Sequence, residues 1–364
     1  MSVHEPVHIP APHYRPFTLA RQGELLAYGQ LTAAQHADFT PVFMVPPREW
    51  NYDKDAYAKS VEAHLQPIPQ KLATARNGAP AYIDLAFLDD ETPTRGVHPL
   101  TWIVERAALL GLPLMPLVSS ESTDETLESA SALNAAQGLG IAIRLGDGEW
   151  PSQDSTILAE MLRKLGTATT EVDLFLDYGA ERSSFVTAAL RGEFSAPHFA
   201  SAWRTITIGG HAWPKDLPTG KGVFEIERSD WMQFETTCQA LFPTALRPGF
   251  FDYLVANPDP RLDVDPKLLT ISASFRYTSS EAWLFVRGGL YKASGGRGKG
   301  GEAVPPALRI LQAHPLYSQP IRTETDNWID LATLGGKPGN SSVWRRWATH
   351  RHVEVTLHQL ANLS

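Results

Sequence analysis

The chain has 364 residues, of which 43% are hydrophobic and 20% are charged. This composition excludes an intrinsically disordered chain, because such chains contain too few apolar residues to form a core. The 32 Lys and Arg residues against 40 Asp and Glu residues give a net charge of −8, which argues against a globally basic nucleic-acid-binding protein.

Eight short apolar runs predict buried β-strands. Most are hydrophobic at nearly every position, as is typical of parallel strands that are covered on both faces. The runs lie at 15–20, 40–46, 81–88, 114–120, 140–146, 172–178, 204–210 and 249–256.

Helical patterns separate these strands. The pattern at 123–137 begins in a Ser-Thr-Asp-Glu segment that is typical of a capping box, and the pattern at 155–165 ends before Gly166. Further helices are expected at 23–31, 55–75, 99–110, 183–190, 198–203 and 230–241.

Strand–helix alternation repeated eight times is the pattern of a parallel sheet with right-handed crossovers. Eight such units over about 250 residues predict an α/β fold, a closed (β/α)₈ barrel of the TIM type. The alternative is an open doubly wound sheet, which often carries a glycine-rich phosphate loop in its first turn. The first turn here, ARQGELLAY, contains a single glycine.

The pattern changes after the eighth strand. Two alternating segments, 269–278 and 281–292, predict a β-hairpin, and a glycine-rich loop follows at 294–302. Helices are expected at 304–314, where prolines occupy the first turn, and at 343–363.

The last helix is the best candidate for the helix that follows strand eight of the barrel. We therefore expect barrel strands over 14–256, an insertion over 257–341 and the final barrel helix over 342–364. Loops that follow barrel strands emerge at the C-terminal face, where active sites lie. The insertion is therefore expected to form a lid over the barrel mouth.

Several short motifs occur in a fixed order over roughly residues 14–362. YRPFTLARQGELLAY and TPVFMVPP contain Tyr-x-Pro, basic-x-Gly-Glu and Pro-Pro signatures. IERSDW, SFRYT, WLFVRGG and WRRWATHRHV follow. Together they resemble the "beta protein" family of phages and bacteria. Two departures are Asp230 in place of the usual Glu, and Arg351 between two histidines that are usually adjacent.

The resemblance implies a barrel of this type. It also implies a phage or defence-associated gene neighbourhood, often with nuclease-like partners. It implies no defined activity, so the chemistry must be sought in the residues themselves.

Charged residues inside the apolar strands are the first candidates for a site, since no GxxxxGK[ST], HExxH, GxSxG or CxxC motif occurs. These residues are Asp84, Arg144, Asp177 and Asp252. A charge is costly to bury unpaired, so each should lie near a strand end or in an ion pair. Barrel active sites are assembled from such strand ends. The alternative is a structural layer of ion pairs, for example Arg144 with Asp177.

The predicted lid hairpin and the last helix supply a second group. Arginine offers a planar fork that suits phosphate or carboxylate, and a helix N-terminus after strand eight is a frequent anion site. The alternatives are surface charge for the arginines and packing for the tryptophans. The candidates are Arg276, Tyr277, Arg287, Trp344, Arg345 and His350.

Three further candidates follow barrel strands. Glu24 follows strand one and is either a carboxylate in the mouth or a first-turn charge favoured by the helix dipole. His211 follows strand seven. The acidic triplet at 89–91 follows strand three and is either a Mg²⁺ site or a solvated loop.

These candidates support three hypotheses. In the first, the protein is a phosphoester hydrolase that acts on a phosphorylated or nucleotide-like substrate. Asp84, Asp177, Asp252 and Glu24 would be catalytic or hold Mg²⁺ or Mn²⁺, and the second group, together with Arg144, would bind substrate. In the second, it is a non-catalytic sensor or regulatory partner of a nuclease-like effector encoded nearby. Nucleic-acid binding through the basic segments near 294–302 and 344–352 is a third hypothesis.

The cellular compartment follows from simple features. The single cysteine, Cys238, cannot form an intramolecular disulfide, and the first residues lack a signal-peptide pattern. The longest apolar stretch, 107–118, is too short to span a bilayer and contains two prolines. We therefore expect a cytoplasmic protein without membrane association, and its oligomeric state stays open.

Overall fold

The computed structural model describes residues 13–88, 96–180, 182–197, 199, 202–241, 247–260, 269–292 and 298–363. The chain divides into two units. The first, here called the barrel unit, comprises Met1–Ala20, Thr32–His211 and Ser229–Tyr253. The second, here called the sheet–helix unit, comprises Arg21–Leu31, Ala212–Arg228 and Leu254–Ser364.

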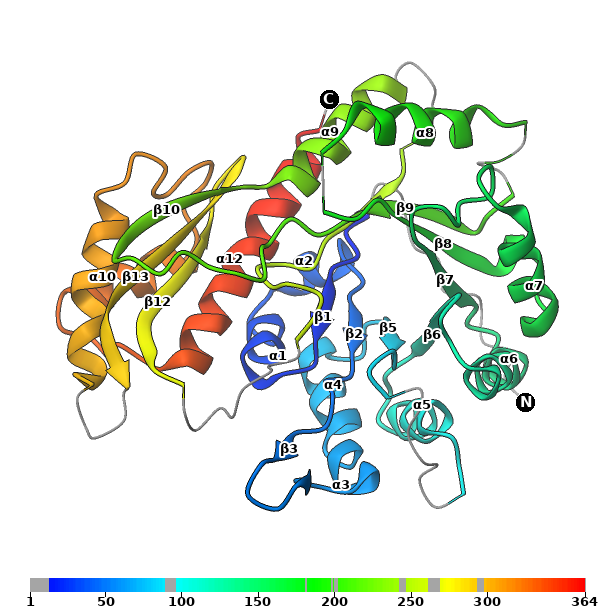
Figure 1. Ribbon diagram of the computed structural model, residues 1–364, viewed down its shortest axis with the longest axis horizontal. Coiled ribbons are helices and arrows are strands. Elements are labelled where there is room, and N and C mark those ends of the chain that lie inside the picture. The colour runs from blue at the N-terminus through cyan, green and yellow to red at the C-terminus, as the bar shows by residue number, and fades with distance from the viewer. Residues whose placement is uncertain are drawn as a thin grey trace. The chain divides into compact units, whose positions relative to one another are not determined.

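The barrel unit is built on a single sheet of eight parallel strands (Figure 1). In spatial order they are β1 (Phe17–Leu19), β2 (Val42–Met44), β5 (Ala81–Asp84), β6 (Leu114–Ser119), β7 (Ile141–Leu145), β8 (Val172–Asp177), β9 (Thr205–Gly209) and β11 (Gly249–Phe251). Their order in space is their order in the chain, as in a barrel in which each crossover leads to the neighbouring strand.

Hydrogen bonds link the two ends of this sheet. Tyr14 forms a parallel bridge with Phe250, the Arg15 amide donates to the Phe250 carbonyl at 2.8 Å, and the Phe17 amide donates to the Asp252 carbonyl at 2.8 Å. The eight strands therefore form a nearly closed barrel, and the predicted TIM-like (β/α)₈ fold and all eight predicted strands are confirmed.

Helices lie outside the ring of strands (Figure 1). They are α2 (Ala33–Ala37), α3 (Val61–Leu65), α4 (Ile68–Arg76), α5 (Pro99–Leu109), α6 (Asp124–Gln137), α7 (Ser155–Leu165), α8 (Ser184–Ser195) and α9 (Ser229–Leu241), with a short 3₁₀ turn η1 (Thr169–Glu171). Local signals set their ends. The Thr123 hydroxyl accepts from the Thr126 amide at the start of α6, and Gly138 and Gly166 adopt positive φ at the ends of α6 and α7.

The helix expected over 55–75 is wrong in its first part and interrupted further on. Residues 50–57 form a small hairpin of β3 (Trp50–Asn51) and β4 (Ala56–Tyr57). Ser60 caps α3 instead, and α3 ends before Pro67. A proline lacks the amide hydrogen and crowds the preceding turn, so one continuous helix cannot form here. Of the helix expected at 198–203, the described residues 199, 202 and 203 are not helical.

Aromatic side chains fill the middle of the barrel. The ring of Phe17 lies 5.8 Å from that of Phe175 and 5.2 Å from that of Phe251, between centroids. Met115 and Ala142 belong to the same buried cluster. Each fully buried large apolar side chain contributes about 1.5–3 kcal/mol of transfer free energy. The barrel interior is therefore a packed core. Polar residues lie at its two ends.

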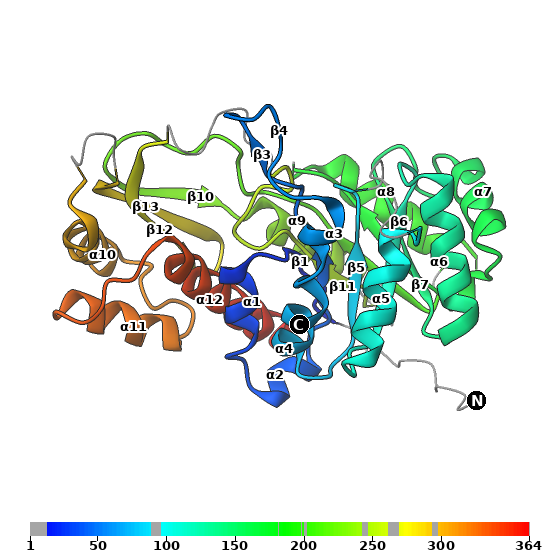
Figure 2. The same cartoon turned by 90° about the horizontal axis from the view of Figure 1, so that it is seen from below.

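The sheet–helix unit has a three-stranded antiparallel sheet in the order β10 (Gly222–Glu227), β13 (Ala282–Lys292), β12 (Ile271–Thr278). The predicted hairpin is confirmed, with Thr278 opposite Trp283 at its turn. The unit also holds α1 (Gln22–Tyr28), α10 (Val304–Gln312), α11 (Glu324–Thr333), α12 (Ser341–Ala361) and the 3₁₀ turn η4 (Gly300–Ala303), seen from another side in Figure 2. Strand β10 and helix α11 were not predicted from the sequence. Within the described part of the chain, no helix is both long and apolar enough to cross a membrane.

Candidate functional site

The C-terminal ends of the barrel strands carry a group of polar side chains, here called the mouth cluster. Asp84 ends β5, Arg144 lies near the end of β7, and Asp177 ends β8. His211 follows β9 and Tyr253 follows β11. Parallel strands bring these ends to one edge of the sheet, so residues far apart in the chain become neighbours.

Arg144 lies at the centre of the mouth cluster. Its Nη1 donates to the Tyr253 hydroxyl at 2.6 Å and lies 3.8 Å from Asp177 Oδ2. The Tyr253 hydroxyl in turn donates to Asp177 Oδ2 at 3.3 Å. The guanidinium is therefore held mainly by a neutral phenol, while its carboxylate partner is at the outer limit of ion-pair distance.

Asp84 and His211 have pKa values that burial shifts in opposite directions. Burial raises the pKa of Asp84, against the opposing effect of Arg144 and of the Ala86 amide, which donates to Asp84 Oδ1 at 2.8 Å. Burial lowers the pKa of His211, although the negative charge of Asp177 opposes this shift. The His211 ring lies edge-on to Tyr253, with centroids 5.7 Å apart. A carboxyl group whose pKa is raised and an imidazole whose pKa is lowered are suited to the roles of acid and base.

Asp252 lies next to this cluster in sequence but outside it in space. Its carboxylate accepts a hydrogen bond from the Tyr14 hydroxyl at 2.7 Å and is fully buried. The neighbouring Phe251 and Tyr253 point into the barrel core. Alternation along an extended chain then directs Asp252 to the other side. The acidic triplet at 89–91 lies outside the described residues.

The candidates of the second group lie in the sheet–helix unit, where three of them meet in one pocket. This cavity of about 110 Å³, here called the α12 pocket, is lined by Val255, Ile271, Ser274, Arg276, Ser341, Trp344, Arg345 and Ala348. Arg276, Trp344 and Arg345 were predicted as substrate-binding residues, and the structure brings them together. Ser274 and Ser341, which also line the pocket, were not predicted from the sequence.

Strand alternation explains the position of Arg276. Phe275 stacks on Trp328 of α11, with centroids 5.6 Å apart, so the next residue points to the opposite face of the sheet. There the Arg276 guanidinium lies 4.7 Å from the centroid of the Trp213 ring and donates to the Val255 carbonyl.

Glu24 and Arg345 join helix α1 to the start of α12. Arg345 Nη1 lies 2.9 Å from Glu24 Oε1, and Glu24 is buried. Gly23 makes this approach possible, since a Cβ atom there would lie 2.9 Å from the Ser342 carbonyl oxygen. The Gly-Glu turn and the Trp-Arg motif, which are distant in sequence, therefore meet at one helix contact.

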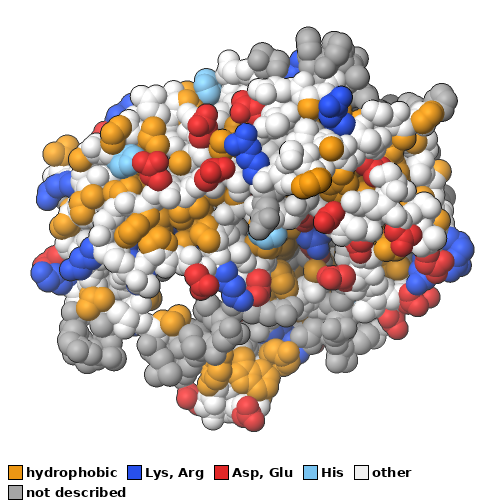
Figure 3. Space-filling model, turned by 45° about the horizontal axis from the view of Figure 1, so that its top comes forward, with side chains coloured by type: hydrophobic (Ala, Val, Ile, Leu, Met, Phe, Trp, Pro, Cys, Tyr) orange, Lys and Arg blue, Asp and Glu red, His pale blue; other side chains and the backbone are white. Residues whose placement is uncertain are grey.

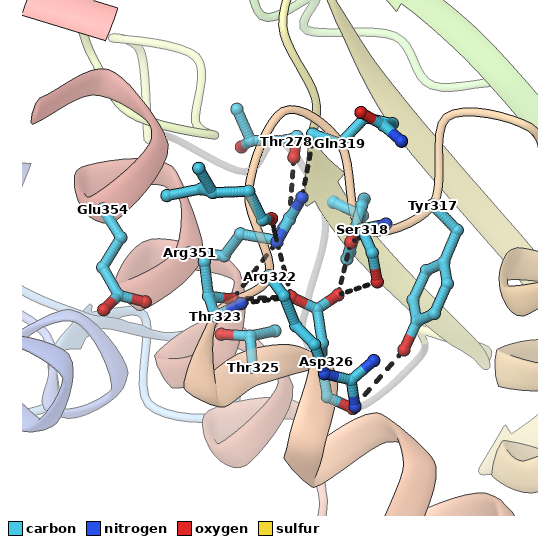
Figure 4. A network of polar contacts seen from close by, with 12 residues as sticks. Thr278, Tyr317, Ser318, Gln319, Arg322, Thr323, Thr325, Asp326, Arg351 and Glu354 are labelled. Atoms are coloured by element: carbon cyan, nitrogen blue, oxygen red, sulfur yellow. Dashed lines mark hydrogen bonds and ion pairs between the residues drawn. The ribbon is translucent and has the colours of Figure 1, made fainter. Parts of the chain in front are cut away.

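Tyr277 belongs to a buried polar network and does not line the α12 pocket. Its hydroxyl donates to Asp326 and accepts from the Ser318 amide at 2.7 Å. Figure 4 shows the centre of this network, where Arg351 Nη1 lies 2.7 Å from Asp326 Oδ2. The Thr323 amide donates to the same oxygen at 2.7 Å, at the start of α11. Arg351 and Asp326 are fully buried, so the network orders this unit.

The two remaining candidates also lie away from the pocket lining. His350 is buried, with Nδ1 3.1 Å from Glu354 Oε2 and its ring edge-on to Trp347. Arg287 donates to the Pro218 carbonyl at 3.1 Å. The His350 contacts lie within α12, whereas the Arg287 contact joins β13 to the segment before β10.

Tyr253 is the residue of the mouth cluster that sequence reasoning missed. An aromatic residue in an apolar run indicates core, and part of the Tyr253 ring does pack there. The available signal was alternation, since Tyr253 shares the side of Phe251 two residues earlier.

Among the residues that the structure describes, no three or more His, Cys, Asp or Glu side chains are grouped so that they could hold a metal ion.

A family model described as Beta protein matches residues 14–358. The chain belongs to the Beta protein family. This confirms the resemblance that the ordered motifs indicated. A comparison with curated proteins found no match for this Beta protein family member.

Several solved structures are similar to this Beta protein family member at low identity. A mutant tryptophan synthase alpha-subunit from Pyrococcus furiosus has 13% identity and a TM-score of 0.37, covering 67% of this chain and 89% of that one. A type I 3-dehydroquinate dehydratase from Clostridium difficile has 10% identity and a TM-score of 0.38, covering 66% and 83%. A 3-hexulose-6-phosphate synthase has 15% identity and a TM-score of 0.33, covering 68% and 94%. Likeness at this level carries no argument about activity.

Proposed function

We propose that this Beta protein family member is an enzyme that acts on a small phosphorylated or nucleotide-like substrate at the mouth of its barrel. Phosphoester hydrolysis is the reaction class. The observation that supports it is the mouth cluster, where one cation, two carboxyl groups and a histidine lie at the strand ends that barrel enzymes use.

Each side chain has a role in this proposal. Arg144 binds a phosphoryl oxygen and stabilises the charge that develops on it, and Tyr253 holds Arg144 in place. His211, neutral at pH 7, accepts a proton from the attacking water, and Asp84 donates a proton to the leaving oxygen. Asp177 orients the Tyr253 hydroxyl. If Mg²⁺ or Mn²⁺ takes part, the carboxylates of Asp84 and Asp177 are the oxygens that the cluster offers, and water completes the coordination.

The test is turnover of a panel of phosphomonoesters, phosphodiesters and nucleotides by the purified chain, with and without Mg²⁺ or Mn²⁺. His211→Gln and Arg144→Met should each lower kcat/KM by about 10²–10⁴-fold. Asp252→Asn is a matched control, because this carboxylate adjoins Tyr253 in sequence but points away from the cluster. Absence of turnover by the wild type, or full activity of Arg144→Met, would contradict the proposal.

The insertion over 257–341 is part of the same proposal as a lid over the mouth. Substrate that draws the lid closed should protect this segment from proteolysis. Equal cleavage with and without a turned-over substrate would argue against the lid.

A second candidate function is that of a non-catalytic sensor or regulator of a nuclease-like effector in phage defence, as the family resemblance implies. The α12 pocket favours it, since the lining has two arginines and no histidine, carboxylate or cysteine. Co-purification of the chain with the product of a neighbouring gene, and loss of this complex in Arg276→Met, would support regulation. A chain that provides defence in cells without any such partner would contradict it.

General nucleic-acid binding has less support. On the face drawn in Figure 3, the Lys and Arg side chains of the described residues lie among Asp and Glu side chains and form no continuous basic surface there. Salt-dependent binding of unspecific DNA or RNA would be expected from a basic surface.

A further inference from the structure

We infer that the sheet–helix unit holds an anion site of its own, in which the α12 pocket binds a phosphate-sized oxyanion between Arg276 and Arg345. The ligand class is inorganic phosphate or the phosphoryl group of a small phosphate ester. The site needs no residue of the mouth cluster, so it goes beyond the function proposed above.

The size of the α12 pocket fits such a group. Its volume of about 110 Å³ is several times the roughly 10–15 Å³ that one water molecule needs by this measure. Apolar residues such as Ile271 and Ala348 form part of its wall, while the Ser274 and Ser341 hydroxyls and two guanidinium groups supply hydrogen-bond donors. A tetrahedral oxyanion can accept several such hydrogen bonds at once.

Arg276 brings a positive charge that its described surroundings do not neutralise. Its contacts are the Val255 carbonyl and the Trp213 ring, both of which are uncharged. None of the described carboxylates lies within ion-pair distance of it. The guanidinium has five N–H donors, so a ligand in the pocket can be bound without breaking the bond to Val255.

The charges near Arg276 add to the uncompensated positive charge of the α12 pocket. Burial, together with the positive charges of Arg345 and Arg21, lowers the pKa of Arg276 to about 9, although the negative charge of Glu24 opposes this shift. Glu24 is already paired with Arg345. An anion between the arginines would remove the repulsion between them, which is the electrostatic reason for binding.

The start of α12 supports the same ligand. The helix has 21 residues, and Ser341 at its first position lines the pocket. The Asn340 side chain already accepts from the Ser342 and Val343 amides, so the helix contributes its dipole and the Ser341 hydroxyl rather than free amides. The two arginines therefore dominate the site.

The test is calorimetric titration of the full chain with inorganic phosphate at low ionic strength, then with ribose 5-phosphate and AMP to separate free phosphate from phosphate esters. Arg276→Met should weaken binding at least tenfold. Arg287→Met is the matched control, because Arg287 lies on the same hairpin but outside the pocket lining. The affinity of this variant for phosphate should stay within twofold of the wild-type affinity. Near-ultraviolet circular dichroism checks the fold of each variant.

A second pair of variants separates this site from the mouth cluster. Arg144→Met should leave a phosphate site that the additional change Arg276→Met removes. If Arg276→Met does not fold, Arg276→Lys, which keeps the charge but loses the fork, should still weaken binding severalfold. The proposal is overturned if the folded wild type binds none of the three ligands, if Arg276→Met or its substitute binds as tightly as the wild type, or if Arg287→Met loses as much affinity.

Discussion

The two ends of the barrel carry the same kinds of residue in different arrangements. At the N-terminal end, Arg204 Nε donates to Asp173 Oδ1 at 2.9 Å, and a second guanidinium nitrogen donates to Oδ2. The Thr205 and Tyr82 hydroxyls add bonds of 2.7 Å to the same carboxylate. At the mouth, Arg144 is 3.8 Å from Asp177 and has its shortest hydrogen bond to Tyr253.

The difference indicates which ion pair stabilises the fold and which is available to a ligand. Asp173 is fully buried, and four donors from its own chain saturate it. A buried charge with complete hydrogen bonding is a structural element. Arg144 and Asp177 retain hydrogen-bonding capacity and some solvent access, as a binding site at strand ends requires. The structural ion-pair layer considered in the sequence analysis is thus represented at both ends, by the saturated Arg204–Asp173 pair and by the longer Arg144–Asp177 pair.

The largest expected difference between the two ends of the barrel is in stability, when the carboxylate of Asp173 or that of Asp177 is removed. Asp173→Ala should lower the free energy of unfolding by about 3–5 kcal/mol, because it leaves the largely buried Arg204 without its partner. Asp177→Ala should lower it by about 1 kcal/mol or less, because the pair is long and partly exposed. Urea unfolding measures both values. Equal destabilisation by the two variants would remove the distinction between the ends.

The two tyrosines allow a smaller, double test. Tyr82→Phe should lower the free energy of unfolding by about 1–2 kcal/mol, since Asp173 loses one hydrogen bond, and should leave turnover unchanged. Tyr253→Phe should have the reverse profile, with unfolding changed by less than about 1 kcal/mol and kcat/KM lowered about 10–100-fold, because Arg144 loses its support. Each variant is the control of the other. A loss of activity in Tyr82→Phe but not in Tyr253→Phe would place the reaction at the N-terminal end of the barrel and contradict the proposed site.

The sequence predicted the barrel because its strands are short apolar runs between clear turns, and burial on both faces leaves little ambiguity. Asp84, Arg144 and Asp177 stood out because charges are rare in such runs. Asp252 stood out for the same reason, but one step of alternation puts it with Tyr14 instead. The face of a residue just past a strand end depends on how the chain leaves the sheet, which the local sequence does not determine.

The sheet–helix unit was harder to predict because its elements depend on distant partners. Strand β10 contains Glu225 and Glu227 and pairs with β13, whose Val286 and Leu284 lie some 60 residues later. No local pattern indicates that pairing. Arg276 and Tyr277 appeared equivalent as hairpin residues, yet alternation places one in the α12 pocket and the other in the Asp326 network.

The smallest expected effect on stability concerns Asp84, whose substitution should stabilise the protein instead of destabilising it. Burial raises the pKa of Asp84 above its ordinary value of 3.8, so the folded state binds the proton more tightly than the unfolded state does. Stability is therefore lost as pH rises from about 3.8 through the folded pKa, and the penalty is complete above it. Asp84→Asn should remove this penalty and stabilise the protein by about 0.5–2 kcal/mol at pH 7. The Asn oxygen can still accept from the Ala86 amide.

The pH dependence makes this last prediction specific. The gain from Asp84→Asn should shrink as pH falls and vanish well below the ordinary pKa of 3.8, where the wild-type carboxyl is protonated in both states. Asp173→Asn should instead destabilise at pH 7, because there the charge itself is what Arg204 binds. Urea unfolding across this pH range measures both trends. Stabilisation together with loss of turnover is the pattern of a group held for chemistry at a cost to the fold. If Asp84→Asn instead destabilises the protein, Asp84 is a structural carboxylate like Asp173 at the opposite end of the barrel.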